Sequence, residues 1–124
     1  MRVSPLDLAH APAEARAAGE AHARDVAPLT NMKRTLLHAP VAFRALMTWY
    51  ELRDAVRPFL GDRATTLFAH AVSAETDCLI CSTFFRRLLV QSGEDPDALV
   101  LSPEEAELVA FGRALAVTPH RVPE

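Results

Sequence analysis

The stretch ETDCLICSTFF, residues 75–85, contains the only two cysteines of the chain, Cys78 and Cys81. Three chemistries fit a C-x-x-C pair: a redox couple, two ligands of a metal ion, or two small apolar side chains in a core. On a helix, the i, i+3 spacing brings two sulfurs within reach of a disulfide. At the first turn of a helix, free N–H groups and the helix dipole also favour a thiolate.

The rest of the sequence argues against a zinc site and against a thioredoxin-like motif. A structural zinc site needs four ligands, and the histidines of this chain are neither paired nor at zinc-finger spacing; they are His10, His22, His38, His70 and His120. A thioredoxin-like motif needs a strand before its helix, and no strand pattern is present. The plain structural alternative, that Cys78 and Cys81 only face the core, stays open, because free cysteine is often buried.

Helical periodicity predicts the elements that must position the cysteines. Large apolar residues recur at spacings of three and four within each of several segments. The pattern predicts helices over 31–37, 40–57, 62–74, 78–91 and 103–117. Pro58 and Gly61 are expected to end the second helix, Thr76 or Asp77 to cap the fourth, and Ser102 to begin a capping box. The fold class is therefore all-α, with the C-x-x-C at a helix N-terminus.

Two regions are expected along the chain. Residues 1–29 are rich in alanine and contain three prolines, and their apolar side chains are mostly small. We therefore expect a weakly packed N-terminal arm, helical at most between Pro12 and Pro28. Residues 30–124 are expected to form one helical domain.

Composition excludes several function classes. A net charge of -3 gives no basic field for a phosphate backbone, so no nucleic-acid partner is expected. No apolar run reaches the ~20 residues of a membrane-spanning helix, and the first residues do not read as a signal peptide. We expect a cytoplasmic chain that contacts no membrane, whose thiols stay reduced unless they cycle.

Taken together, the segments FAHAVSAETD, CLICSTFFRRLL and LSPEEAELVAFGRAL resemble the carboxymuconolactone decarboxylase and alkylhydroperoxidase D superfamily over residues 30–124. The resemblance implies an all-helical bundle that forms homo-oligomers and reduces peroxides without a cofactor or metal. It also implies that Cys81 attacks the peroxide and Cys78 resolves the product as a disulfide. An external dithiol, such as a lipoylated or thioredoxin-like protein, would then reduce that disulfide.

The chain departs from the peroxidase members of that family at the proton relay. They have a His four residues after the second cysteine and a Glu twelve residues before the first, where this chain has Phe85 and Thr66. Two other side chains could exchange the proton. His70 lies one turn after Thr66 on the same predicted helix, and Glu75 lies beside the cysteines. Packing or solvation is the alternative role of each.

The family resemblance also bears on assembly. Members of the family continue with further helices after the stretch corresponding to AVTPHRVPE. Either the domain is incomplete at its C-terminus, or other subunits cover its apolar faces. The alternative function is accordingly that of a non-catalytic helical subunit in an oligomer, with cysteines that serve only packing.

Overall fold

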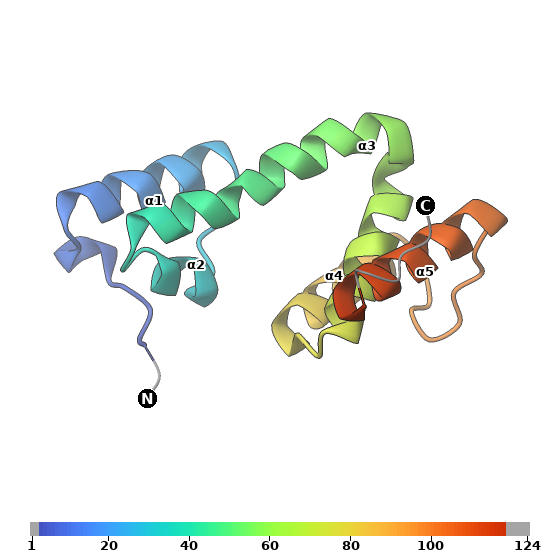
Figure 1. Ribbon diagram of the computed structural model, residues 1–124. Coiled ribbons are helices and arrows are strands. Elements are labelled where there is room, and N and C mark those ends of the chain that lie inside the picture. The colour runs from blue at the N-terminus through green and yellow to red at the C-terminus, as the bar shows by residue number, and fades with distance from the viewer. Residues whose placement is uncertain (1–2, 119–124) are drawn as a thin grey trace. The chain divides into compact units, whose positions relative to one another are not determined.

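The computed structural model describes residues 3–118, and these are helical with no strand among them, as the sequence predicts (Figure 1). A short 3₁₀ helix, η1 (Leu8–His10), precedes the α-helices. They are α1 (Ala13–Asp25), α2 (Asn31–Leu36), α3 (Pro40–Glu75), α4 (Leu79–Gln91) and α5 (Pro103–Val117). None of these helices is both long and apolar enough to cross a bilayer. The chain divides into two compact units, Met1–Asp54 and Ala55–Glu124, and α3 runs from one into the other.

The first unit is built on a stripe of small residues along α1. The small residues are Ala15 and Gly19, four positions apart and both buried, and the buried His22 follows three positions later. The stripe lets large side chains approach closely, and a Cβ added at Gly19 would lie only 2.9 Å from Leu37 Cδ1. Ala15 and Leu37 share a core with Ala11 and Phe43. The structure thus differs from the weakly packed arm expected for residues 1–29, because small helical residues can still bury a neighbour's large ones.

The boundary between α2 and α3 lies where the sequence predicts it, and the structure adds a cap at the start of α2. Thr30 caps α2, its side chain accepting a hydrogen bond from the Lys33 N–H at 3.3 Å. The helix ends before Pro40, which begins α3. The division at residues 54 and 55, however, falls inside α3 rather than after residue 29, because Phe43 on α3 packs into the core that α1 and α2 build.

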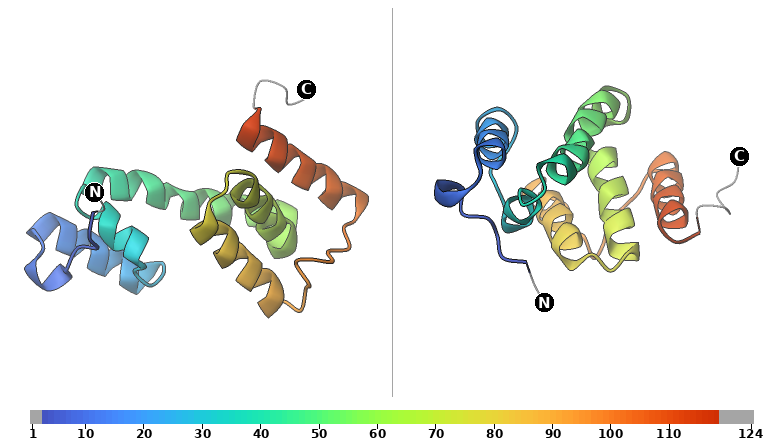
Figure 2. Two further views of the ribbon diagram at one scale, coloured as in Figure 1. Left: turned by 90° about the horizontal axis from the view of Figure 1, so that it is seen from below. Right: turned by 60° about the vertical axis from the view of Figure 1, so that its left-hand side comes forward.

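The second unit has its core between three helices. Leu67 and Ala71 on α3, Leu89 on α4 and Val109 on α5 form a buried cluster, with Leu99 and Leu101 packed against it. Figures 1 and 2 show α4 and α5 beside the C-terminal part of α3. The capping box at Ser102 is present, with Glu105 as its second member. Its presence confirms the predicted start of α5.

The break expected near Pro58 and Gly61 occurs at Gly61 alone. Its φ of 80° and ψ of 165° interrupt α3, whereas Pro58 lies inside the helix. That backbone conformation is open to glycine and strained for other residues. The segment after Gly61 is therefore a separately directed helical piece, and it carries His70 and Glu75 toward the turn before α4.

Candidate functional site

The turn between α3 and α4 sets the position of the cysteines. The Thr76 hydroxyl donates back to the Val72 carbonyl at 2.9 Å, so it is used by the end of α3. Asp77 adopts the left-handed conformation with a φ of 51°. The Cys78 N–H then donates to the Ser73 carbonyl at 3.0 Å, which closes the turn. The expected cap at Thr76 or Asp77 is wrong, because Cys78 itself occupies the N-cap position of α4.

Both thiols lie at the beginning of α4 and are free and half-buried. Cys78 holds the N-cap position and Cys81 follows in the first turn. The neutral Cys78 side chain makes no capping hydrogen bond. The Cys81 thiol and the N–H groups of Ile80 and Cys81 nevertheless face its sulfur, where they stabilise a thiolate once it forms.

The two thiols differ in acidity. The pKa of Cys78 is lowered from its ordinary value, first by the hydrogen bond from the Cys81 thiol and then by the Cys81 and Ile80 N–H groups. The pKa of Cys81 is raised to about 11, first by burial and then by the same hydrogen bond, which holds its proton in place. Cys78 is therefore the thiol that ionises first, and Cys81 keeps its proton.

The structure does not bring the two candidate proton carriers into the thiol pair. His70 is half-buried, and its pKa is lowered first by burial and then by the charges of Arg86 on α4 and Arg113 on α5. Its imidazole is therefore neutral near pH 7. Glu75 is exposed at the last position of α3. Neither His70 nor Glu75 contributes to the pKa shift of either thiol.

The positions that carry the proton relay in the resembled family have structural roles here. The Thr66 hydroxyl donates to the Asp62 carbonyl at 2.8 Å, a bond within its own helix. Phe85 packs edge-to-face on Phe84, with ring centroids 5.2 Å apart. Neither side chain supplies an acid or a base to the thiols.

The surface around the cysteines is apolar. Leu79 and Ile80, the two residues between the cysteines, are 79% and 72% exposed. Phe84 is also exposed, one turn further along α4. The C-x-x-C spacing alone gave no sign of this surface, although the letters L and I between the cysteines are the signal that could have predicted it.

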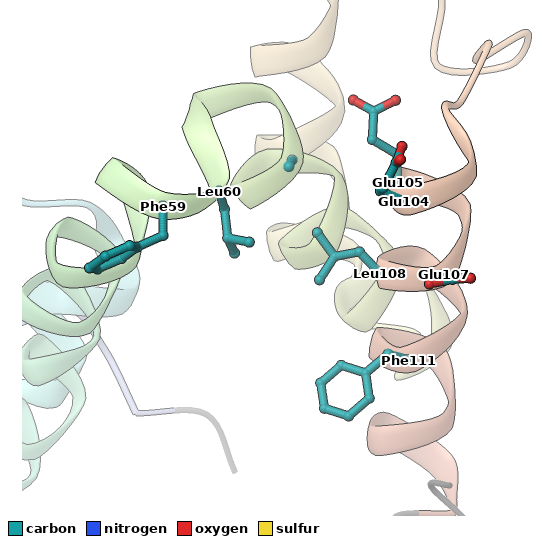
Figure 3. Close-up of a pocket in the computed structure, with 8 residues that line it drawn as sticks. Phe59, Leu60, Glu104, Glu105, Glu107, Leu108 and Phe111 are labelled. Carbon is teal, nitrogen blue, oxygen red and sulfur yellow. The ribbon is translucent and has the colours of Figure 1, made fainter. Parts of the chain in front are cut away.

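A shallow apolar groove of about 520 Å³ lies elsewhere in the second unit, and its lining contains neither cysteine. Leu60 on α3 and Leu108 and Phe111 on α5 form its apolar walls. Figure 3 shows Leu108 and Phe111 reaching toward α3, with Glu104 and Glu105 at the start of α5. Glu105 is ion-paired with Arg63 and Glu104 accepts a hydrogen bond from Ser102, so these polar groups already have partners.

The donors weighed for a metal are dispersed. His10 binds Asp7, His38 contacts the Ser4 carbonyl, and His22 is buried in the first unit, while His120 lies outside the described residues. Within residues 3–118, no group of three or more His, Cys, Asp or Glu side chains could hold a metal ion. The chemistry available at the start of α4 is that of the thiol pair.

Comparison of the chain with protein families, curated proteins and solved structures found no match.

Proposed function

We propose that the chain is a thiol–disulfide oxidoreductase in which Cys78 and Cys81 cycle between dithiol and disulfide, with a peroxide as the oxidant. The observation that carries the proposal is the position of two free, half-buried thiols at the N-cap and in the first turn of α4, beside an exposed apolar surface. Cysteines that only fill a core are buried, whereas a redox pair must be reached by its oxidant and its reductant, and a helix start favours the thiolate form. The peroxide itself rests on the resemblance of residues 30–124 to the alkylhydroperoxidase D superfamily.

The reaction balances with these two residues and an external dithiol. The Cys78 thiolate attacks one peroxide oxygen, the O–O bond breaks, and Cys78 becomes a sulfenic acid while the alkoxide takes a proton to leave as an alcohol. Cys81 then attacks the sulfenic sulfur, which forms the disulfide and releases water. A dithiol partner in a reducing cytoplasm returns two electrons and two protons, restoring both thiols.

The proposed order of attack is the reverse of that implied by the family resemblance, which makes Cys81 the attacking thiol. Local electrostatics support Cys78 instead, because its thiolate is stabilised and that of Cys81 is not. Solvent water supplies the proton that the alkoxide takes in this scheme, since neither His70 nor Glu75 contributes to the pKa shift of either thiol.

The test is a titration of the reduced protein with one equivalent of a peroxide, followed by counting free thiols over time. We expect both thiols to be lost together in the parent. In Cys81→Ser, Cys78 should still react and remain as a sulfenic acid that a dimedone reagent traps. In Cys78→Ser, the loss should be far slower. The reverse result for the two variants would assign the attack to Cys81, and no loss in the parent would overturn the redox function.

A second candidate is favoured by the exposed apolar residues of α4. Leu79, Ile80 and Phe84 form a surface of the kind that assembly covers. In this alternative the chain is a non-catalytic subunit of a homo-oligomer, and the thiols serve only packing. It predicts a stable oligomer whose size does not change when both cysteines are replaced by serine, together with unreactive thiols.

A further inference from the structure

A histidine is buried without a partner in the first unit, far along the chain from the cysteines. His22, in the last turn of α1, is only 6% exposed. Its Nε2 atom is buried and has no hydrogen-bond partner among the described residues. A buried polar atom without a partner lowers stability, and a charge at the same place would lower it much further.

Two aromatic rings contact the His22 imidazole, and a buried cation lies over one of these rings. Phe43 and Tyr50 of α3 meet it edge-on, with ring centroids at 5.4 Å and 5.5 Å. Lys33 of α2 is buried, donates to the Pro28 carbonyl at 3.1 Å, and holds its Nζ 4.8 Å from the centroid of the Tyr50 ring.

Several other charged residues of the first unit form ion pairs. Arg53 lies over the Tyr50 ring at 5.0 Å and is salt-bridged to Asp54. On α1 itself, Asp25 is paired with the neighbouring Arg24 and Glu14 with Arg44 of α3. These carboxylates are therefore engaged by arginines, whereas Lys33 is itself buried and its charge acts on His22.

We propose that His22 makes the first unit acid-sensitive: when its imidazole takes up a proton, α1 is released from α2 and the beginning of α3. Release would hydrate the new imidazolium and separate it from the Lys33 ammonium. It would also open the core in which Ala15 and Leu37 meet Phe43. The helix dipole at the end of α1 favours a cation, but desolvation of the ring outweighs it.

The sign of the pH dependence follows from linkage. Burial, and then the charge of Lys33, lower the pKa of His22 below its ordinary 6.5. Above that value the imidazole is neutral in both the packed and the released state, and the packing is unaffected. As the pH falls below 6.5, the released state binds the proton first, so packed α1 is progressively disfavoured. This window lies above the range near pH 4 in which the carboxylates titrate.

The test is amide hydrogen exchange of α1 in the full chain, corrected for the intrinsic effect of pH on exchange. Between about pH 7.5 and about pH 5, the opening equilibrium of α1 should rise by up to about 30-fold in the parent. His22→Leu should remove the rise. The matched control is His70→Gln, which removes the other histidine with a lowered pKa but lies in the second unit, and it should keep the rise.

Two outcomes would overturn the proposal: no rise in the parent, or a rise that persists in His22→Leu. Should His22→Leu fold poorly, the parent alone decides, through NMR titration of the His22 imidazole protons. A midpoint below 6.5, with broadening of the α1 resonances through the same pH range, is expected. A midpoint at or above that value would show that burial does not disfavour the charge and would end the proposal.

Discussion

At the scale of residues, the two cysteines at the start of α4 change each other's pKa. The Cys81 thiol donates to Cys78 and so acidifies it, while its own proton is retained. The sequence shows two cysteines three positions apart and a helix start, and it predicts their proximity. It does not predict which one ionises, because that depends on burial and on the direction of one hydrogen bond.

We predict that removing the donor changes the acidity of the remaining thiol. In Cys81→Ala, Cys78 loses the largest cause of its lowered pKa. The pH midpoint for alkylation of Cys78 by iodoacetamide, followed by intact mass, should therefore rise relative to Cys81→Ser, whose hydroxyl still donates. Equal midpoints in the two variants would show that the helix start alone sets the acidity of Cys78.

At the scale of elements, most features that depend on a few neighbouring residues are predictable from the sequence, whereas contacts between helices are not. The capping box at Ser102 and the break at Gly61 are encoded within a few residues, so the sequence predicts them. The packing of α1 depends on Leu37, the residue that follows α2, reaching Gly19, and no local pattern reveals this contact. The predicted cap of α4 is wrong, because the Thr76 hydroxyl hydrogen-bonds to a carbonyl of the preceding helix. The all-helical class was predictable from the sequence. The conformation of the turn that places the two cysteines at the start of α4 was not.

An ion-pair cluster fixes the loop between α4 and α5. Arg63 on α3 pairs with Glu94 and Glu105 and also donates to the Val100 carbonyl at 2.9 Å. The guanidinium lowers the pKa of both carboxyls. Carboxylates with a lowered pKa stabilise the folded state above their ordinary pKa, and that contribution is lost as the pH falls through the lowered value.

We predict that Arg63→Met flattens the acid side of the stability curve. Between neutral pH and about pH 3, the free energy of unfolding of the parent, measured by chemical denaturation, should lose the contribution of Glu94 and Glu105. The loss should begin near their ordinary pKa of about 4.5. The variant should have a smaller free energy of unfolding at neutral pH, and this free energy should decrease less as the pH is lowered. Arg86→Met, which breaks the exposed pair with Asp97 but leaves the cluster intact, is the comparison, and an identical curve for both variants would count against the cluster.

We also predict a cost for a side chain at Gly61. No atom lies within 4 Å of the place where a Cβ would stand, so the effect of Gly61→Ala is one of backbone conformation alone. Destabilisation of about 1–3 kcal/mol is expected, measured by urea unfolding. Gly112→Ala is the contrasting variant, because its Cβ would press on the Phe68 ring at 3.1 Å. Unchanged stability in Gly61→Ala would mean that the kink relaxes into a straight helix.

At the scale of the whole molecule, α4 in the second unit carries several large apolar residues that are exposed. Resemblance to an oligomeric family and the exposure of Leu79, Ile80 and Phe84 support assembly through this surface. The family resemblance predicts apolar faces that other subunits cover, but it does not predict which residues form them. Which residues remain exposed depends on how the three helices meet.

We predict that Phe84→Asp lowers the oligomeric state, because a carboxylate would have to be buried at the contact. Sedimentation velocity over a range of concentrations should show a smaller species than in the parent. Val41→Asp is the matched control, since Val41 is an exposed apolar residue of α3 in the first unit. A parent that is monomeric at all concentrations, or an equal effect of both variants, would contradict assembly through α4.

The break at Gly61 has a further consequence that concerns chirality. At a φ of 80° an l-residue is strained, but the same angles fall in the ordinary extended range for its mirror image. The space around the position is open. A chain assembled by chemical ligation with d-alanine at position 61 should therefore fold at least as stably as the glycine form, since it has fewer unfolded conformations to lose. The configuration of one Cα atom would then favour the bend in α3.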